Sequence, residues 1–162
     1  MSTTINLLAD AKIVELLTPA TDAAGRTGSW VNGKLATKAY IRVHIAQGNA
    51  ATILLTVKQA TSAAGAGAKV ITVAVPISFN LDTSVNDTLV AQAAAVNFTT
   101  DAGVKNKQVV FELDLISILD FLNGFTWFTI VTGASNLANL TEAEAILVGL
   151  TYHQNPPLSA VV

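Results

Sequence analysis

The stretch AYIRVHIAQG, residues 39–48, decides the fold class that this sequence predicts. Apolar Ile41, Val43 and Ile45 alternate along it with Tyr40, Arg42 and His44. A period of two places successive side chains on opposite faces of a strand, and β-branched residues favour that conformation. The stretch ends at a glycine followed by an asparagine, which are common turn residues. It therefore predicts a β-strand with one buried face.

The same alternation recurs along the chain and predicts about eight strands, which favours an all-β sandwich. Long connections at residues 18–38 and 82–99 favour a jelly roll or Greek key over an up-and-down meander. Helical signal is confined to residues 117–124, where a cap-like Ser117 and a terminating glycine predict one or two helical turns. The other predicted strands are residues 51–60, 68–75, 106–116, 125–132 and 144–153, with weaker candidates at 12–17, 77–81 and within 89–99.

The chain has 162 residues, a length that fits one domain with its own core. We expect a single β-sandwich domain over residues 1–162, with a flexible N-terminal segment at 1–10 and an extended C-terminal tail at 155–162. The loop QATSAAGAG, residues 59–67, is too small-residued to pack and too long for a two-residue hairpin turn. It predicts a mobile loop that projects from the sandwich.

Charge is scarce, since charged residues make up 12% of the chain against about 25% in typical soluble domains. Either partners cover much of the surface, or alanine and threonine raise the apolar share without making adhesive patches. A net charge of −2 without a basic cluster argues against nucleic-acid binding. Apolar runs are too short for a membrane helix, and the first residues lack the basic region of an export signal. We therefore expect a soluble protein with neither membrane nor nucleic-acid partners.

The acidic residues predict structural roles rather than chemistry. Glu112 and Asp114 lie two residues apart on one strand face, whereas paired glycosidase carboxylates usually come from different strands. Asp120 follows in the helical turn. DTSVND, residues 82–87, lacks the glycine and glutamate of an EF-hand loop, so a turn closed by Asx hydrogen bonds explains it better than a cation site.

The remaining motifs also predict no reaction. His44 and His153 lack the spacing of a metal pair, and each is expected to be a solvated or interface imidazole. The sequence has no cysteine and no nucleotide-binding or hydrolase signature. We therefore predict that the chain is not an enzyme, and that it has no catalytic, cofactor-binding or metal-ligating residues and needs no cofactor.

Candidate partner-binding residues lie near the ends of the chain and beside one turn. Trp30 stands among turn residues in GSWVNGK, where it can plug one end of the sandwich or meet a partner; the plug is favoured. Prolines cannot donate ladder hydrogen bonds, so the tail is expected to leave the sheet and lie on protein. The predicted partner-binding residues are Leu7, Leu8, Trp30, Pro156, Pro157 and Leu158.

The order of these features resembles a family of small virion proteins of tailed bacteriophages. The residues that carry the resemblance are GSWVNGKLATKAYIRVHIAQGNAATILLTVKQATSAAGAGAKVI (28–71), VVFELDLISILDFLNGFTWFTIVTG (109–133) and EAEAILVGLTYHQNP (142–156). They share a tryptophan, an alternating strand that closes on Gln-Ala, an Ala/Gly-rich loop, an acidic strand with a Leu-Asp turn, and a final strand that ends in tyrosine. The resemblance covers most of the chain, from Leu16 to Tyr152.

The resemblance implies a capsid decoration (cement) protein, bound as trimers outside the capsid lattice. Its expected partners are two further copies of itself and the major capsid protein. Its expected location is the virion surface, after synthesis in the host cytoplasm. Such a family implies no catalytic residues. Two alternatives stay open: a tail, neck or head-fibre component of the virion, and a carbohydrate-binding β-sandwich used for host adhesion.

Overall fold

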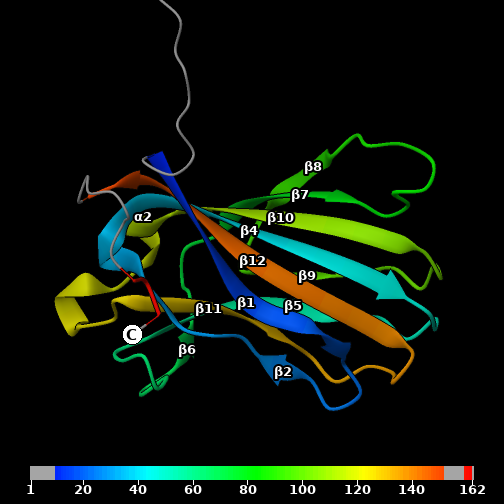
Figure 1. The fold of residues 1–162 in the computed structure, drawn as a ribbon, viewed down its shortest axis with the longest axis horizontal. Coiled ribbons are helices and arrows are strands. Elements are labelled where there is room, and N and C mark those ends of the chain that lie inside the picture. The colour runs from blue at the N-terminus through cyan, green and yellow to red at the C-terminus, as the bar shows by residue number, and fades with distance from the viewer. Residues whose placement is uncertain (1–9, 152–158, 162) are drawn as a thin grey trace, which may run out of the picture.

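The computed structural model describes residues 10–151 and 159–161, which form two antiparallel sheets packed face to face (Figure 1). Sheet A has the order β1-β12-β4-β10-β7-β8. Sheet B has the order β2-β11-β5-β6, with β3 also paired to β11 and β9 to β5. The strands of sheet A are β1 (Ala11–Thr21), β4 (Ala36–Gln47), β7 (Val75–Asn80), β8 (Val90–Ala95), β10 (Asn106–Asp114) and β12 (Asn139–Leu150). Those of sheet B are β2 (Arg26–Thr27), β3 (Val31–Asn32), β5 (Leu54–Ala60), β6 (Lys69–Val70), β9 (Asn97–Thr99) and β11 (Trp127–Thr132).

The strand order is that of a jelly roll, which confirms the predicted β-sandwich. The groups β1-β12-β4-β10 and β2/β3-β11-β5-β9 face each other, and the chain winds between them as two Greek keys do. The described chain has twelve strands rather than about eight. One jelly-roll strand is divided into β2 and β3. Between these two pieces the chain passes close to β1, since a side chain at Gly28 would come within 3.0 Å of the carbonyl oxygen of Leu16. The strands β6, β7 and β8 are inserted between β5 and β9.

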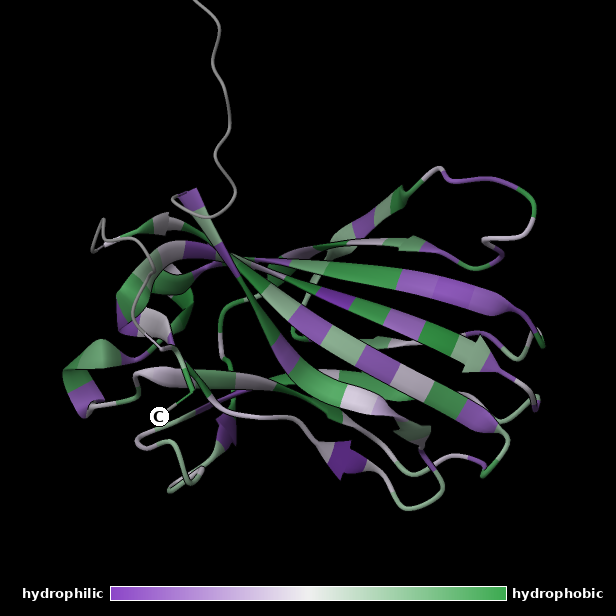
Figure 2. Ribbon diagram, viewed as in Figure 1, coloured by the Kyte–Doolittle hydropathy of each residue, from purple (hydrophilic) through white to green (hydrophobic). Residues whose placement is uncertain are grey.

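Alternating apolar residues fill the space between the sheets. Ile41 and Val43 of β4 are fully buried, as are Val109 and Phe111 of β10. Figure 2 shows the resulting alternation of hydrophobic and hydrophilic residues along β4 and β12. In β12 the core positions are Ala143, Ala145 and Leu147, so the outer face of that strand carries the residues between them. The predicted strands at 39–48, 51–60, 106–116 and 125–132 are confirmed, with shifted ends.

Two predicted strands each divide between the sheets. In residues 68–75, only Lys69 and Val70 pair with β5 before the chain crosses to sheet A as β7. Ile71 and Val75 anchor the crossing in the core, whereas Val73 between them is 42% exposed. Residues 89–99 similarly form β8 in sheet A and β9 in sheet B. A run of alternating apolar residues therefore did not distinguish one strand from two short ones.

The helical signal is confirmed as two short turns, α2 (Leu115–Ile118) and η2 (Phe121–Asn123); a third turn, η1 (Gly33–Leu35), precedes β4. The cap of α2 is Asp114, whose carboxylate accepts from the amide of Ile116, and not Ser117 as predicted. η2 ends at Gly124 in a left-handed conformation, as expected. None of the helical segments in the described chain has the length or apolar character to cross a membrane.

The described end of the C-terminal tail returns to its own sandwich. Ala160 is fully buried, and its carbonyl oxygen accepts a hydrogen bond of 2.9 Å from the amide of Asn32 in β3. The predicted partner residues Leu7, Leu8, Pro156, Pro157 and Leu158 lie outside the described residues. Ala160 therefore helps to close the core beside β3.

One buried ionic cluster ties the two sheets together. The carboxylate of Asp22, which is fully buried, accepts from Thr132 of β11 at 2.8 Å and from Thr141 of β12. Arg26 pairs with the same carboxylate at 3.1 Å, and its guanidinium also donates to the carbonyl oxygens of Thr18 and Ala20. Each polar atom of the cluster thus has a partner, which a buried charge requires.

Replacement of Asp22 by alanine should lower the free energy of unfolding by about 3–5 kcal/mol, because the change leaves Arg26 Nε and two threonine hydroxyls without their acceptor. Urea denaturation measures this loss. The matched control is Asp87→Ala at an exposed aspartate, which should stay within about 0.5 kcal/mol of the wild type. Equal effects of the two substitutions would contradict the role of Asp22.

Candidate functional site

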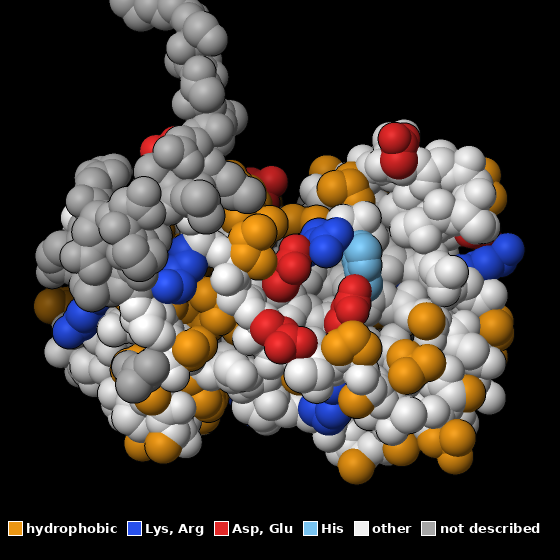
Figure 3. Space-filling view, viewed as in Figure 1, with side chains coloured by type: hydrophobic (Ala, Val, Ile, Leu, Met, Phe, Trp, Pro, Cys, Tyr) orange, Lys and Arg blue, Asp and Glu red, His pale blue; other side chains and the backbone are white. Residues whose placement is uncertain are grey.

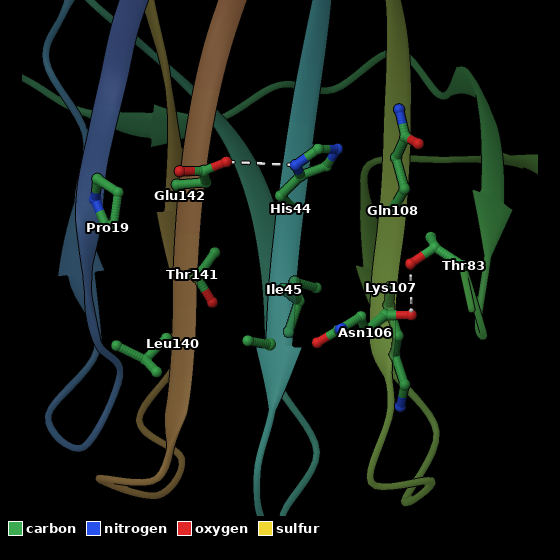
Figure 4. A pocket seen from close by; sticks show the side chains of 11 residues that line it. Pro19, His44, Ile45, Thr83, Asn106, Lys107, Gln108, Leu140, Thr141 and Glu142 are labelled. Atoms are coloured by element: carbon green, nitrogen blue, oxygen red, sulfur yellow. Dashed lines mark hydrogen bonds and ion pairs between the residues drawn. The ribbon is translucent and has the colours of Figure 1, made fainter. Parts of the chain in front are cut away.

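A polar groove crosses the outer face of sheet A and is the best candidate site in the described chain. Figure 3 shows acidic and basic side chains and a histidine gathered in a hollow on this face. The groove has a volume of about 460 Å³ and adjoins a second hollow of about 400 Å³, with which it shares His44 and Glu142. Its walls come from four strands and one loop, with Pro19, His44, Thr83, Asn106, Gln108, Leu140, Thr141 and Glu142 among the lining residues (Figure 4).

Strand register brings the charged residues of the groove together. In the β12–β4 ladder, Glu142 lies opposite His44 and Glu144 lies opposite Arg42. The Nδ1 atom of His44 is 3.2 Å from Glu142 Oε1, and Figure 4 shows the two side chains pointing toward each other. Arg42 Nη1 lies 3.2 Å from His44 Nε2, while Arg42 Nε donates to Glu144 at 2.9 Å. The four side chains form one hydrogen-bonded row.

The row determines the tautomer of His44. A guanidinium has only donors, so Arg42 donates to Nε2 and this nitrogen acts as the acceptor. In this tautomer the ring proton is on Nδ1, directed at the carboxylate of Glu142. Both carboxylates of the row are engaged by donors from β4, which holds them as fixed hydrogen-bond acceptors. Such an arrangement suits recognition of hydroxyl or amine groups better than proton transfer.

A third carboxylate, Glu15 of β1, lies opposite Glu144 in the β1–β12 ladder and lines the second hollow. Together, Glu15, Glu142, Glu144 and Arg42 give the two hollows a net negative charge. Within the described ranges, no group of three or more histidine and acidic residues has the geometry of a metal site. The carboxylates therefore gather in the second hollow, whereas the groove has one carboxylate, Glu142, beside amide and hydroxyl groups.

The other acids that the sequence singled out lie apart from each other. Asp114 caps α2, and Asp120 pairs with Lys69 at 2.9 Å; this ammonium, with Asn123, lowers the pKa of Asp120. Lys69 also lies 3.9 Å from the ring centroid of Phe125. Glu112 is exposed on β10, opposite Tyr40. These positions agree with structural roles.

The DTSVND stretch forms a turn closed by its own side chains. Asp82 Oδ1 accepts from the amide and the hydroxyl of Ser84, and Asn86 Oδ1 accepts from the amide of Thr88. Lys105 lies 3.0 Å from Asp82 Oδ2. The hydroxyl of Ser84 and the ammonium of Lys105 lower the pKa of Asp82. The predicted Asx hydrogen bonding is confirmed.

Trp30 is half-buried at one end of the sandwich, where the Ala/Gly-rich loop packs against it. A side chain at Gly65 would stand 2.5 Å from Trp30 Nε1. Hydrogen bonds from the amide of Gly65 to Ser62, and from Thr61 to Ala66, close the loop on itself. Gln59 and Ala60 belong to β5 and are buried. The prediction that this loop does not pack is therefore wrong at Gly65, where the absence of a side chain allows close contact with the indole, whereas most of residues 61–68 are exposed, as a projecting loop requires.

A buried lysine lies beneath the groove. The ammonium of Lys107, fully buried, donates to Gln47 Oε1 at 2.9 Å and to the carbonyl oxygen of Asp101 at 3.0 Å, and it pairs with the Asp101 carboxylate. This pairing lowers the pKa of Asp101. Sequence reasoning missed Lys107, Glu142 and Glu144, because their importance depends on which strand lies beside β4. The outward alternation of residues 142 and 144 was the one available signal.

Comparisons with known proteins add no assignment, since neither a protein-family model nor a curated protein matches this chain.

Gly65→Ala should destabilise the protein more than Gly124→Ala. Both glycines have positive φ, +77° and +81°, so both substitutions introduce a similar backbone strain of about 1 kcal/mol. Only Gly65 meets a neighbour, the Trp30 indole, whereas Gly124 has open space. Urea unfolding should show the larger loss for Gly65→Ala, together with a shift in tryptophan emission. Identical losses would show that the loop does not pack on Trp30.

Asp101→Asn should destabilise the protein at neutral pH by an amount that shrinks in acid. The pKa of Asp101 is lowered in the folded state, so its pairing with Lys107 stabilises the fold above the unfolded pKa, about 3.9, and is lost as pH falls through the lower folded value. Thermal unfolding of both proteins between pH 2 and pH 7 tests this. Asp87→Asn serves as the control, and a difference independent of pH would contradict the pairing.

Proposed function

We propose that this chain is a structural protein of a tailed-bacteriophage virion, which binds the outside of the capsid as a trimer and stabilises it. The resemblance over residues 16–152 supports the proposal, as does the jelly roll, an architecture that viral capsid domains and lectins share. A decoration protein works by attachment to a lattice, and multivalent contact with a repeating shell makes modest affinities effective.

The observation that carries the proposal is an unprotected sheet edge. Natural proteins guard edge strands with charges, prolines and bulges. β1, at one edge of sheet A, has Lys12, Glu15 and Pro19 and two register shifts against β12. β8, at the other edge, reads VAQAAA and has neither a charge nor a proline; its one irregularity is a register shift against β7 between Gln92 and Ala95. An edge left open in this way is a docking surface for protein backbone.

Capsid shells assembled without the protein test the proposal. Purified protein should co-sediment with shells built from the major capsid protein of the phage that encodes it, raise the temperature at which the shells disassemble, and sediment alone as a trimer. Binding to purified tails or necks instead of shells would favour another virion role. A protein that binds no virion part would overturn the proposal.

Deletion of residues 2–8 should weaken shell binding at least tenfold without changing the stability of the sandwich, because the pairing of β1 with β12 begins at Ala11. The tail needs another design, since truncation to residue 155 would also remove Ala160, which is buried. Triple substitution of Pro156, Pro157 and Leu158 by serine tests the tail alone. Wild-type shell binding by both variants would show that the termini do not clasp the lattice.

A carbohydrate-binding role is the second candidate, and the groove on sheet A favours it. Fixed carboxylates beside amide groups, as at Glu142 and Gln108, suit the hydroxyl groups of a sugar. Glycan-array binding that Glu142→Gln and Gln108→Ala both abolish, in variants that still bind shells, would establish this role. Unaltered or absent glycan binding would remove it.

A further inference from the structure

The chain contains two Asn-Gly dipeptides, Asn32-Gly33 and Asn123-Gly124, and the structure gives them opposite surroundings. An asparagine followed by glycine can modify itself, because the glycine has no Cβ atom to hinder approach of its amide nitrogen to the asparagine side chain. The reaction requires the backbone of the pair to move, so its rate depends on how firmly the fold holds each glycine. The two dipeptides therefore provide a comparison within one molecule.

The first dipeptide joins β3 to η1 and is fixed from several sides. Gly33 is buried, and a Cβ atom at this position would lie 2.3 Å from Leu119 Cδ1. The amide of Gly33 donates to the carbonyl oxygen of Thr126 at 2.8 Å, and the amide of Asn32 donates to the carbonyl oxygen of Ala160 at 2.9 Å. Movement of this dipeptide would therefore require the core beside β3 to open.

The second dipeptide ends the exposed turn η2, at the end of the sandwich that carries α2 (Figure 1). None of the residues of η2 is buried, and Leu122 is fully exposed. Gly124 has a φ of +81°, and no atom lies within 4 Å of the position that a Cβ atom would take. Its amide donates to the carbonyl oxygen of Phe121, 3.1 Å away in the same turn. Short 3₁₀ turns have poor hydrogen-bond geometry, so η2 opens at a lower cost than the core does.

We propose that Asn123 deamidates spontaneously in the folded protein, whereas Asn32 is protected. The amide nitrogen of Gly124 attacks the Cγ atom of Asn123, the bond between Cγ and Nδ2 breaks, and ammonia leaves with the amide proton of Gly124. The product is a five-membered succinimide ring. Water then opens the ring at one of its two carbonyl carbons, which gives aspartate or isoaspartate. Water is the one co-reactant that the sequence of steps consumes.

Deamidation changes the contacts of η2 as well as its charge. Asn123 Nδ2 donates to both carboxylate oxygens of Asp120, at 2.9 and 3.0 Å, and Asp120 also pairs with Lys69. A carboxylate at position 123 has no proton to donate, and it places a second negative charge beside Asp120. The modified turn therefore loses two hydrogen bonds and gains a repulsion. This change does not depend on the capsid role.

A time course of the purified protein in mildly alkaline buffer tests the proposal, because base removes the glycine amide proton and so accelerates the reaction. Peptide mapping by mass spectrometry measures aspartate and isoaspartate at both sites, in the folded protein and in urea. In urea the two dipeptides should react at similar rates, since no fold restrains either of them. In the folded protein, Asn123 should react at least about tenfold faster than Asn32.

Two variants of Asn123 complete the test. Asn123→Gln should not react in the same time, because its longer side chain would have to close a larger ring. Isoelectric focusing should show a more acidic form of the wild type that this variant lacks. Asn123→Asp imitates one product and should unfold at a lower temperature than Asn123→Ala, because repulsion from Asp120 adds to the lost hydrogen bonds. Added salt should reduce that difference.

Equal rates at Asn32 and Asn123 in the folded protein would overturn the proposal. So would an Asn123 that stays intact in the folded protein while both sites react in urea, since the contacts with Asp120 would then hold the turn closed. An acidic form that persists in Asn123→Gln would also overturn it, because the modification would then lie elsewhere in the chain. None of these results bears on shell binding, which is measured separately.

Discussion

The register of β4 within sheet A is the constraint on which the rest of the structure depends. β4 lies between β12 and β10, and its inward residues Ile41 and Val43 are fully buried. Because side chains alternate along a strand, a slip of one residue would move that apolar set to the solvent and bring Arg42 and His44 into the core. Burial of the apolar face of β4 therefore determines which residues lie on its outer face. The hydrogen-bonded row on the outer face is a consequence of core packing, since the same register that buries Ile41 places Arg42 beside Glu144 and His44 beside Glu142.

The local sequence pattern was sufficient to predict the fold class, because apolar and polar residues alternate within each strand and the apolar set becomes the buried face. Residues 39–48 needed no knowledge of their neighbours. The local pattern could not predict which distant strands pair. The groove depends on β12 lying next to β4, a contact between residues about a hundred positions apart in the chain. The crossing between Ile71 and Val75 was missed for a related reason. Both residues are buried as a continuous strand would require, but Ile71 directly follows β6 of sheet B, whereas Val75 begins β7 of sheet A.

Composition gave two explanations for the scarcity of charge, and the structure adds a third contribution. Many of the charges are used inside the molecule. Of the nine lysine and arginine residues, at least five form ion pairs with aspartate or glutamate within the described residues: Arg26, Arg42, Lys69, Lys105 and Lys107. One of these, Lys107, is fully buried, and another pairs with the buried Asp22. These groups hold the two ends of the sandwich and the face of sheet A in place.

This internal use of charge has a consequence for association. Repulsion between copies depends on net charge, and a protein of this size with a net charge of −2 has little of it. Charged side chains that are fixed in pairs within one copy are also poor guards of an edge strand, because they cannot extend over it. β1 carries its own protection in Lys12, Glu15 and Pro19, whereas β8 has none of the three residue types that would block an incoming strand. The asymmetry between two edges of one sheet is difficult to attribute to composition alone, since both strands belong to the same charge-poor chain. Both edge strands have a register shift against their neighbour, so the difference between the two edges lies in their side chains: β1 carries charges and a proline, and β8 carries neither.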